Sequence, residues 1–278
     1  MREIIKSWRN RPDLNKNEQY KLAKDGLQIL DDLPRFASLT QQEMLASDVE
    51  LLKWAGIYAQ RPRDGHYLVR AKLPSGALTA AQAKVLADIS RDYCRHTIQI
   101  TDRLSLQIHW LELRVLADVV QRLHAAGLTS TEACGDCPRN ILGNPLMGVD
   151  PEETVDTEPI VAALIEKFQG NPAFSNLPRK FKISVSANPH DTGFARINDI
   201  AFVPAEYEGQ AGFHVYVGGG LSKEPKLAQQ LPFFVRPTEV VRVAEAVATI
   251  FREHGYRANR AHCRLKYLVE DWGVAKFS

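Results

Sequence analysis

The chain has 278 residues, of which 45% are hydrophobic, so it can bury a sizeable core as one large domain or two modest ones. Its 35 basic and 33 acidic residues leave a net charge of +2, which argues against nucleic acid or an anionic membrane as a general partner. The N-terminal residues do not resemble a signal peptide and no segment is apolar enough to span a membrane, so we expect a cytoplasmic protein.

Residues 1–57 predict a helical N-terminal extension. The stretch is rich in charged residues and is interrupted by two prolines. Within residues 41–56, apolar side chains recur near helical spacing, at Met44, Leu45, Val49, Leu52 and Trp54. We therefore expect this region to be helical and to lead into the first regular unit of the chain.

Residues 58–127 predict a ferredoxin-like half-domain. The expected elements are a strand at 66–73, a helix opened by a capping box at Thr79 and Gln82, strands at 96–101 and 104–111, and a helix ended by Gly127. The resulting order, β-α-β-β-α, is that of a ferredoxin-like α+β unit.

Residues 128–278 predict a second domain of mixed α+β structure. It begins with a loop over 131–153 that is dense in Gly, Pro, Asn and Asp, and loops of this length inside compact domains are usually functional or disordered. The elements expected after it are a helix at 158–168, strands at 181–187, 197–204 and 213–219, and a helix from Thr238 to Gly255. The fold class expected for the whole chain is α+β.

Two lysines stand side by side at the start of one predicted strand. Alternation in residues 176–190 places on one face Lys180, Lys182, Ser184 and Ser186, and on the other Arg179, Phe181, Ile183 and Val185. A solvated edge strand is one interpretation of such lysines, and an anion pocket is the other. Basic residues also recur in or beside other segments, at Arg70, Arg103, Arg139, Arg260 and Arg264. Taken together, they favour a local cationic site.

The cysteines, the glycine-rich segment and the histidines give weaker indications of a functional site. Cys134 and Cys137 form a single CxxC without the second ligand pair that a zinc site needs, and with Cys94 and Cys263 they do not form a disulfide framework. The segment VGGGLS at 217–222 matches neither phosphate-loop spacing, so a glycine-rich turn is the better interpretation. The eight histidines show no metal-ligand spacing, and we predict no metal site from these residues.

Seven segments occur in one order that a known family shares: YLVRAKLPSG, ITDRLSLQIH, PRNILGNPLMGVDP, LPRKFKISV, INDIAFVP, VGGGLS and NRAHCRLKYLVEDWG. In these segments the chain resembles the first half of the sirohaem-dependent nitrite and sulfite reductases, over roughly residues 50–278. The resemblance implies a ferredoxin-like half-domain over 58–127 and the first copy of a sirohaem-binding domain over 128–278, which follow the helical extension expected over 1–57.

The resemblance also implies roles for individual residues. The inorganic anion on the distal face of the haem is expected to be surrounded by Arg70, Arg139, Lys180 and Lys182. The macrocycle or its carboxylates are expected to meet Thr101, Arg103, Gln107, Asn140 and Arg179, with Arg264 and Lys266 as further candidates. Sirohaem carries eight carboxylates, which suit arginine forks, and lysines crowded by other cations should have lowered pKa values that favour proton donation.

One departure from the family concerns the iron–sulfur cluster. In that family the haem iron is joined through a cysteine to a [4Fe-4S] cluster whose four cysteines lie in the second half of the protein. The cysteines of this chain do not match those motifs. We therefore expect a part of a longer reductase, which reduces nitrite or sulfite with ferredoxin as electron donor once the missing half is supplied in the same or another chain.

Two alternative functions stay open at this point. Neither is catalytic, so whether the chain is itself an enzyme stays open too. The first is a non-catalytic remnant that binds sirohaem or another tetrapyrrole. The second is an α+β module that binds anions or RNA. Against RNA, the chain has no aromatic strand of the RNA-recognition type and its net charge is near zero. The same cations suit nitrite and sulfite, so the residues do not distinguish the two substrates.

Overall fold

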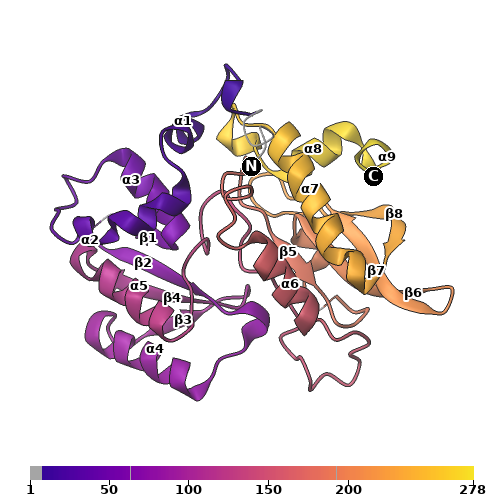
Figure 1. Ribbon diagram of the computed structural model, residues 1–278, viewed down its shortest axis with the longest axis horizontal. Helices are drawn as coiled ribbons and strands as arrows, with labels where there is room; N and C mark the ends of the chain where they lie inside the picture. Colours follow the sequence, from indigo (N-terminus) through magenta and orange to yellow (C-terminus); the bar gives the residue numbers. More distant parts are fainter. Residues whose placement is uncertain (1–7, 63, 192) are drawn as a thin grey trace.

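The computed structural model describes residues 8–62, 64–191 and 193–278, and these residues form two four-stranded sheets with helices packed on each (Figure 1). The strand order is β1-β2-β4-β3 in the first sheet and β5-β6-β7-β8 in the second. Each sheet has its own hydrophobic core. The α+β class that the sequence predicts is confirmed.

The first sheet is antiparallel throughout. Its elements are β1 (Ile57–Ala59), β2 (Tyr67–Lys72), β3 (Ile98–Ile100) and β4 (Ser105–Leu111), with helices α4 (Ala80–Tyr93) and α5 (Leu116–Ala125). The capping box at the start of α4 is present, with Thr79 accepting from the Gln82 N–H and Gln82 accepting from the Thr79 N–H. The β-α-β-β-α order is confirmed, and β1 is an added edge strand too short to show strand periodicity.

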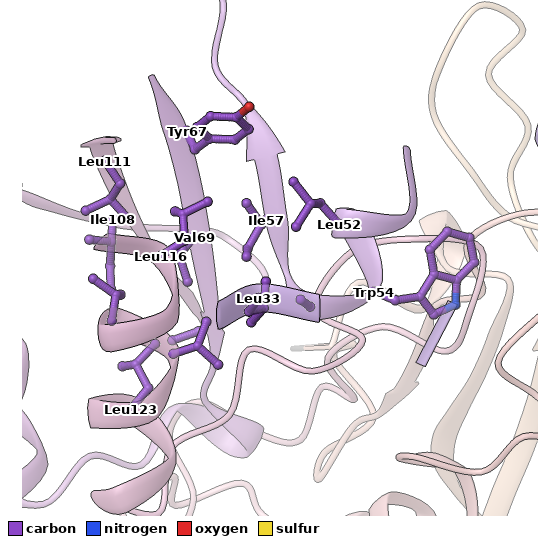
Figure 2. Close-up of a cluster of buried hydrophobic side chains, with 14 of the residues drawn as sticks. Leu33, Leu52, Trp54, Ile57, Tyr67, Val69, Ile108, Leu111, Leu116 and Leu123 are labelled. Atoms are coloured by element: carbon purple, nitrogen blue, oxygen red, sulfur yellow. The ribbon is translucent and has the colours of Figure 1, made fainter. Parts of the chain in front are cut away.

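The N-terminal extension consists of short helices, and these complete the first core. They are α1 (Lys16–Ala23), η2 (Gly26–Asp32), α2 (Leu33–Phe36), α3 (Ala46–Leu51) and η3 (Leu52–Ala55). Residues 41–45 form a turn instead of the expected helix, and residues 1–7 lie outside the described part of the chain. Figure 2 shows Leu33, Leu52 and Trp54 from this region beside side chains of the sheet and α5.

A long irregular segment, 131–153, connects the two sheets, as the sequence predicts. It runs parallel to the chain before β5 (Ile183–Val185), through isolated bridges between Pro138 and Phe181 and between Leu142 and Ser184. The Arg139 N–H donates to the Phe181 carbonyl at 2.8 Å, and the Phe181 N–H donates to the Cys137 carbonyl at 3.0 Å. These bonds satisfy buried backbone groups, which lets a loop lie inside the molecule.

The second sheet contains β5, which is parallel to β6, and two antiparallel pairs. The remaining elements are β6 (Ile200–Tyr207), β7 (Gln210–Val217), β8 (Gln229–Val235), α6 (Glu158–Phe168), α7 (Val240–His254), α8 (Leu265–Trp272) and α9 (Val274–Phe277). The predicted strand at 181–187 is real but shorter, because its first residues bind the 131–153 loop. The edge strand β8 was not predicted, since Pro232 interrupts its pattern.

Single turns of 3-10 helix join several elements. They are η4 (Pro74–Gly76), η5 (Leu113–Val115), η6 (Ala195–Ile197), η7 (Pro237–Glu239) and η8 (Arg260–His262). Among the described residues, none of the helices has both the length and the apolar character needed to cross a bilayer.

Candidate functional site

A polar cavity of about 230 Å³ brings together side chains from both halves of the described chain. It is lined by Arg70 of β2, Ser105 and Gln107 of β4, Thr101, Asp102 and Arg103 of the β3–β4 turn, Ala133, Arg139 and Asn140 of the 131–153 loop, and Lys180 and Lys182 before β5. All four residues that the sequence assigns to the anion line this cavity. Four of the seven candidates for the macrocycle, Thr101, Arg103, Gln107 and Asn140, line it too.

Strand register places Arg70 on the cavity wall. Arg70 and Gln107 are direct partners in the antiparallel pair of β2 and β4, so their side chains lie on the same face. The Arg70 Nη2 donates to Gln107 Oε1 at 3.1 Å, and the guanidinium lies 5.8 Å from the centre of the Tyr58 ring. Its Nε is buried without a hydrogen-bond partner in the described structure. The Nε–H of Arg70 is therefore a hydrogen-bond donor that no described residue uses.

Arg139 is held by the backbone of its own loop. Its Nε and Nη2 donate to the Gly135 carbonyl at 3.1 and 2.9 Å, and its Nη1 donates to the Ala133 carbonyl at 3.2 Å. The side chain is buried, so these neutral acceptors fix its position without cancelling its charge.

Lys180 and Lys182 lie two residues apart in an extended segment, so both reach the same cavity. Burial, together with Arg139 and Arg264, lowers the pKa of Lys180 to about 7. Burial and Arg103 lower the pKa of Lys182 to about 8, against the opposing effect of Asp199. The expected direction is confirmed, although burial and not cation crowding is the larger cause. Both ammonium groups can therefore exchange a proton near neutral pH.

Hydrogen bonds tie the β3–β4 turn to the 131–153 loop. Asn140 Nδ2 donates to the carbonyls of Leu73, Arg103 and Leu104 at 3.2, 3.0 and 2.8 Å. In return, Arg103 donates from Nη2 to the Asn140 carbonyl at 3.0 Å and from Nη1 to Asn198 Oδ1 at 2.7 Å. Burial lowers the pKa of Arg103 to about 10, which leaves it charged at neutral pH. The two sides of the cavity are thus rigidly joined.

Three predicted residues do not line the cavity. Arg179 donates from Nη1 to Asp136 Oδ1 at 3.2 Å, and Arg264 donates from Nη2 to both Asp199 oxygens at 3.0 and 2.9 Å. The Lys266 ammonium donates to the Glu224 carbonyl. Arg179 and Arg264 are held elsewhere by buried aspartates, and Lys266 by a backbone carbonyl of the exposed residue Glu224.

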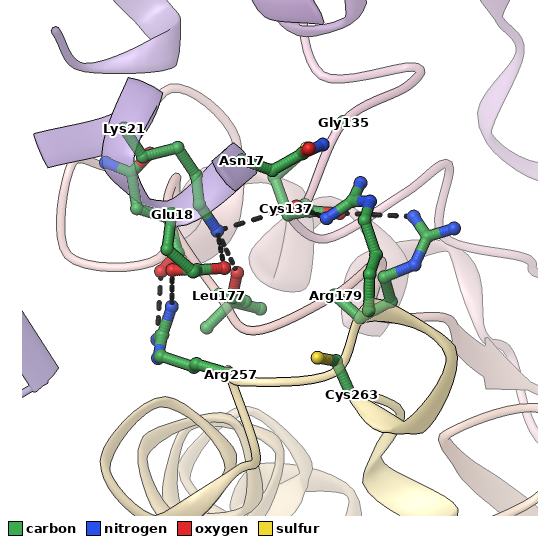
Figure 3. A network of polar contacts seen from close by, with 12 residues as sticks. Asn17, Glu18, Lys21, Gly135, Cys137, Leu177, Arg179, Arg257 and Cys263 are labelled. Atoms are coloured by element: carbon green, nitrogen blue, oxygen red, sulfur yellow. Dashed lines mark hydrogen bonds and ion pairs between the residues drawn. The ribbon is translucent and has the colours of Figure 1, made fainter. Parts of the chain in front are cut away.

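Asp136 is the centre of a larger buried network. Besides Arg179 it pairs with Arg260 at 2.7 Å and with Lys21 at 3.5 Å. Lys21 in turn pairs with Glu18, which also binds Arg257 at 2.6 Å, and Figure 3 shows these three side chains. The network therefore joins α1, the 131–153 loop, Arg179, and the chain before and at the start of η8.

Asp136 and Asp199 divide the arginines and lysines into two groups. Outside the cavity, Arg179 and Arg260 pair with Asp136, and Arg264 pairs with Asp199. The cavity cations, by contrast, have no carboxylate within ion-pair distance in the part of the chain that the structure describes; they are Arg70, Arg103, Arg139, Lys180 and Lys182. Asp102 is the one acid in the described lining. The cavity is thus left with uncompensated positive charge. Sequence patterns did not reveal this division, because they do not show which arginine meets which aspartate.

The four cysteines do not fit a [4Fe-4S] cluster. Cys94 lies in the first core, and all four thiols are buried. Burial raises the pKa of Cys137 well above its usual value and that of Cys263 to about 11, so both stay protonated. Within the described residues, no group of three or more His, Cys, Asp or Glu side chains is arranged to hold a metal ion.

A ferredoxin-like unit joined to a second α+β unit, with a cationic cavity between their side chains, is an arrangement found in a reductase family. Residues 58–126 match the family model for the nitrite/sulfite reductase ferredoxin-like half domain, and residues 134–278 match the model for the nitrite and sulphite reductase 4Fe-4S domain. The chain belongs to the nitrite and sulfite reductase family, which confirms the resemblance seen in its sequence.

Similarity to individual members supports the assignment to this family. The chain is 38% identical over 287 residues to sulfite reductase [ferredoxin] 2 of Mycolicibacterium paratuberculosis, covering 96% of this chain and 51% of the relative. It is 39% identical over 271 residues to the ferredoxin–nitrite reductase of Leptolyngbya laminosa, covering 95% and 53%. The solved structure of the Mycobacterium tuberculosis NirA protein superposes with a TM-score of 0.90 at 35% identity, covering 98% and 54%. The chain thus spans about half the length of the relatives it matches.

Proposed function

We propose that this chain is the anion-binding half of a sirohaem-dependent reductase that converts nitrite to ammonia or sulfite to sulfide. The observation that carries the proposal is the uncompensated positive charge of the cavity, since buried cations without acidic partners are costly unless an anion joins them. The relatives named above as nitrite and sulfite reductases support these substrates, and the word ferredoxin in their names supports that electron donor.

The residues present fit both an inorganic anion and the cofactor's carboxylates. A volume of about 230 Å³ lies below the range of pockets that enclose a drug-sized molecule, so the cavity suits the anion and not the macrocycle. Arg70, which lines the cavity, has a buried Nε without a hydrogen-bond partner among the described residues. Carboxylates of sirohaem would be held by Arg103, Gln107 and Thr101. Asn140 already donates its Nδ2 to three backbone carbonyls, and Arg179 and Arg264 could take part only by leaving their aspartates.

Bound sirohaem would supply the electron transfer. The cavity residues have complementary roles in our proposal: Arg70 and Arg139 hold and orient the anion through guanidinium N–H groups. Lys180 and Lys182, with pKa values of about 7 and 8, bind it as ammonium ions and donate protons from Nζ to oxygen atoms that leave as water.

The proposal also includes a second half of the reductase, which carries the ligands of the [4Fe-4S] cluster. The cysteines of this chain do not fit the [4Fe-4S] cluster, so turnover requires a second half that carries those ligands in the same or another chain. We take the non-catalytic tetrapyrrole-binding remnant as the competing proposal. Cytoplasmic location and the domain boundaries at residues 57 and 127 stay predictions from the sequence.

The test is binding of nitrite to the purified chain by calorimetry, followed by reconstitution with sirohaem. We expect saturable nitrite binding that Lys182→Ala weakens by about tenfold or more, because it removes a charge-assisted contact worth roughly 1.5–3 kcal/mol, while sirohaem uptake stays largely intact. Turnover with reduced methyl viologen that appears only when a second half is added supports the enzyme. Sirohaem absorption without turnover in that mixture supports the remnant, and a colourless protein that binds RNA contradicts both.

A further inference from the structure

A buried carboxylate, Asp199, lies directly behind the lysine side of the cavity. Its Oδ2 accepts the N–H of Lys182 at 2.9 Å, and its own backbone N–H donates to the Lys182 carbonyl at 3.1 Å. One residue therefore binds the peptide groups on both sides of the Lys182 Cα. Lys182 precedes β5, so no regular strand pairing performs this task for its N–H.

Asp199 is in turn held by Arg264. The guanidinium donates from Nη2 and Nε to the carboxylate at 2.9 to 3.2 Å, and both side chains are buried. The glycine-rich turn at 217–222 makes room for this pair: a Cβ on Gly220 would lie 2.8 Å from Arg264 Nη2. The Gly218 N–H also donates to the Asp199 carbonyl at 2.9 Å. This turn, which showed no phosphate-loop spacing, thus packs around an ion pair.

Among the described residues, the charged groups with the largest effects on the pKa of Lys182 are Arg103, Asp199, Arg264 and Arg139, and of these Asp199 is the acid. Lys180, two residues earlier, shares Arg139 and Arg264 as neighbours, and the charged groups with the largest effects on its pKa are all cations. Asp199 is therefore placed to affect Lys182 in two separable ways, by holding its backbone and by supplying a negative charge.

We propose that Asp199 is a positioning residue for Lys182, which fixes that lysine at the cavity wall through its carboxylate and backbone while Arg264 holds the carboxylate in place. The inference rests on the proposed function only for the reason why Lys182 must be held. Arg264 then serves the anion indirectly, in place of the direct contact with the macrocycle that the resemblance implies.

The experiment compares Asp199→Asn with Asp199→Ala in the full chain. Asparagine keeps an oxygen that accepts the Lys182 N–H but removes the charge, whereas alanine removes both. The titration of Lys182 is followed by trace acetylation from about pH 6 to about pH 11 with mass spectrometry, with the exposed Lys223 as an ordinary reference. Nitrite affinity is measured on the same proteins.

We expect opposite shifts in the two variants. In Asp199→Asn, Lys182 stays in place without its acid and titrates below the wild-type value. In Asp199→Ala, Lys182 is released, titrates higher, and nitrite affinity at neutral pH falls by about tenfold or more, the loss of one charge-assisted hydrogen bond. Glu18→Gln, which breaks an equally buried ion pair outside the cavity, controls for general loss of stability and should leave Lys182 unchanged.

Shifts of the same sign and size in both variants would overturn the positioning role, as would a folded Asp199→Ala protein that titrates and binds like the wild type. If Asp199→Ala fails to fold, Asp199→Asn decides: an unchanged Lys182 titration there refutes the inference. Failure of the wild type to bind nitrite would instead count against the proposed function, while the acetylation profile would still test whether Asp199 holds Lys182.

Discussion

At the scale of single residues, the two cavity lysines make anion binding depend on pH. Their pKa values of about 7 and 8 mean that both are charged in mildly acidic solution and both lose protons as the pH rises towards 9. A bound anion favours the charged forms, so binding is linked to proton uptake. Above pH 7, affinity should fall by up to about tenfold per pH unit for each lysine that has lost its proton.

Nitrite is the suitable probe for this prediction, because it keeps one charge throughout the range whereas sulfite changes its own. Calorimetry in two buffers of different ionisation heat measures affinity and proton uptake together. Lys182→Met should abolish the step near pH 8 and move the step of Lys180 to a pH above 7, because the Lys182 charge helps to lower the pKa of Lys180. An affinity that is flat from pH 6 to pH 9 would show that neither lysine meets the anion.

The same lysines should lower the stability of the fold. The folded pKa of Lys180 lies below the unfolded value of about 10.4, so the unfolded chain binds more protons between those two values. Stability contributed by this group is therefore poorest below pH 7 and rises as the pH increases from 7 to about 10. Replacing Lys180 by Met should stabilise the chain at pH 6, on the order of 1 kcal/mol after allowance for partial exposure, while weakening nitrite binding.

Urea unfolding at pH 6 and pH 10 measures this effect, and the difference between wild type and Lys180→Met should shrink at the higher pH. Lys84 supplies a matched control, since it is an exposed lysine on α4 whose replacement by Met should change stability little at either pH. A Lys180→Met protein that is less stable than wild type at pH 6 would contradict the prediction.

At the scale of secondary-structure elements, the capping box at the start of α4 can be tested by substitution. Thr79 accepts from the Gln82 N–H and Gln82 accepts from the Thr79 N–H, which satisfies two donors that the helix leaves unpaired. Thr79→Ala should lower the free energy of unfolding by about 1 kcal/mol, whereas Thr79→Ser keeps the hydroxyl and should lose only a few tenths. Equal losses in the two variants, measured by urea unfolding, would show that the hydroxyl contributes nothing.

Elements with long periodic patterns or clear caps were predictable from sequence, and short or paired ones were not. Helices α4, α5, α6 and α7 lie where the apolar spacing and stop residues place them, within a few residues. Strand β1 was missed because its three residues do not lie in a longer alternating run, as those of β3 and β5 do, and β8 was missed because it contains Pro232. In the site, a family resemblance identified eight of the eleven residues that line the cavity and missed Asp102, Ser105 and Ala133. Ion pairing between distant segments, which sequence patterns do not show, makes Arg179 and Arg264 face aspartates.

At the scale of the whole molecule, a buried ion network links the two ends of the described chain. Glu18 of α1 accepts from Arg257, 239 residues further on, at 2.6 Å, and all of this pair is buried. Lys21 extends the network to Asp136 and to the Leu177 carbonyl at 2.9 Å. The N-terminal extension is therefore joined both to the second domain and to the loop that carries Arg139.

Removing one partner of this network should be more harmful than replacing a pair. Glu18→Gln leaves the Arg257 guanidinium buried without its counter-charge, and we expect a loss of about 3–5 kcal/mol in the free energy of unfolding. In Glu18→Gln combined with Arg257→Met, no uncompensated guanidinium remains, so much of that loss should be recovered. Guanidinium chloride unfolding of the two variants and of Arg257→Met measures the coupling. If the double variant is as unstable as the sum of the single ones, Glu18 and Arg257 act independently, and the two ends of the chain are held together by apolar packing instead.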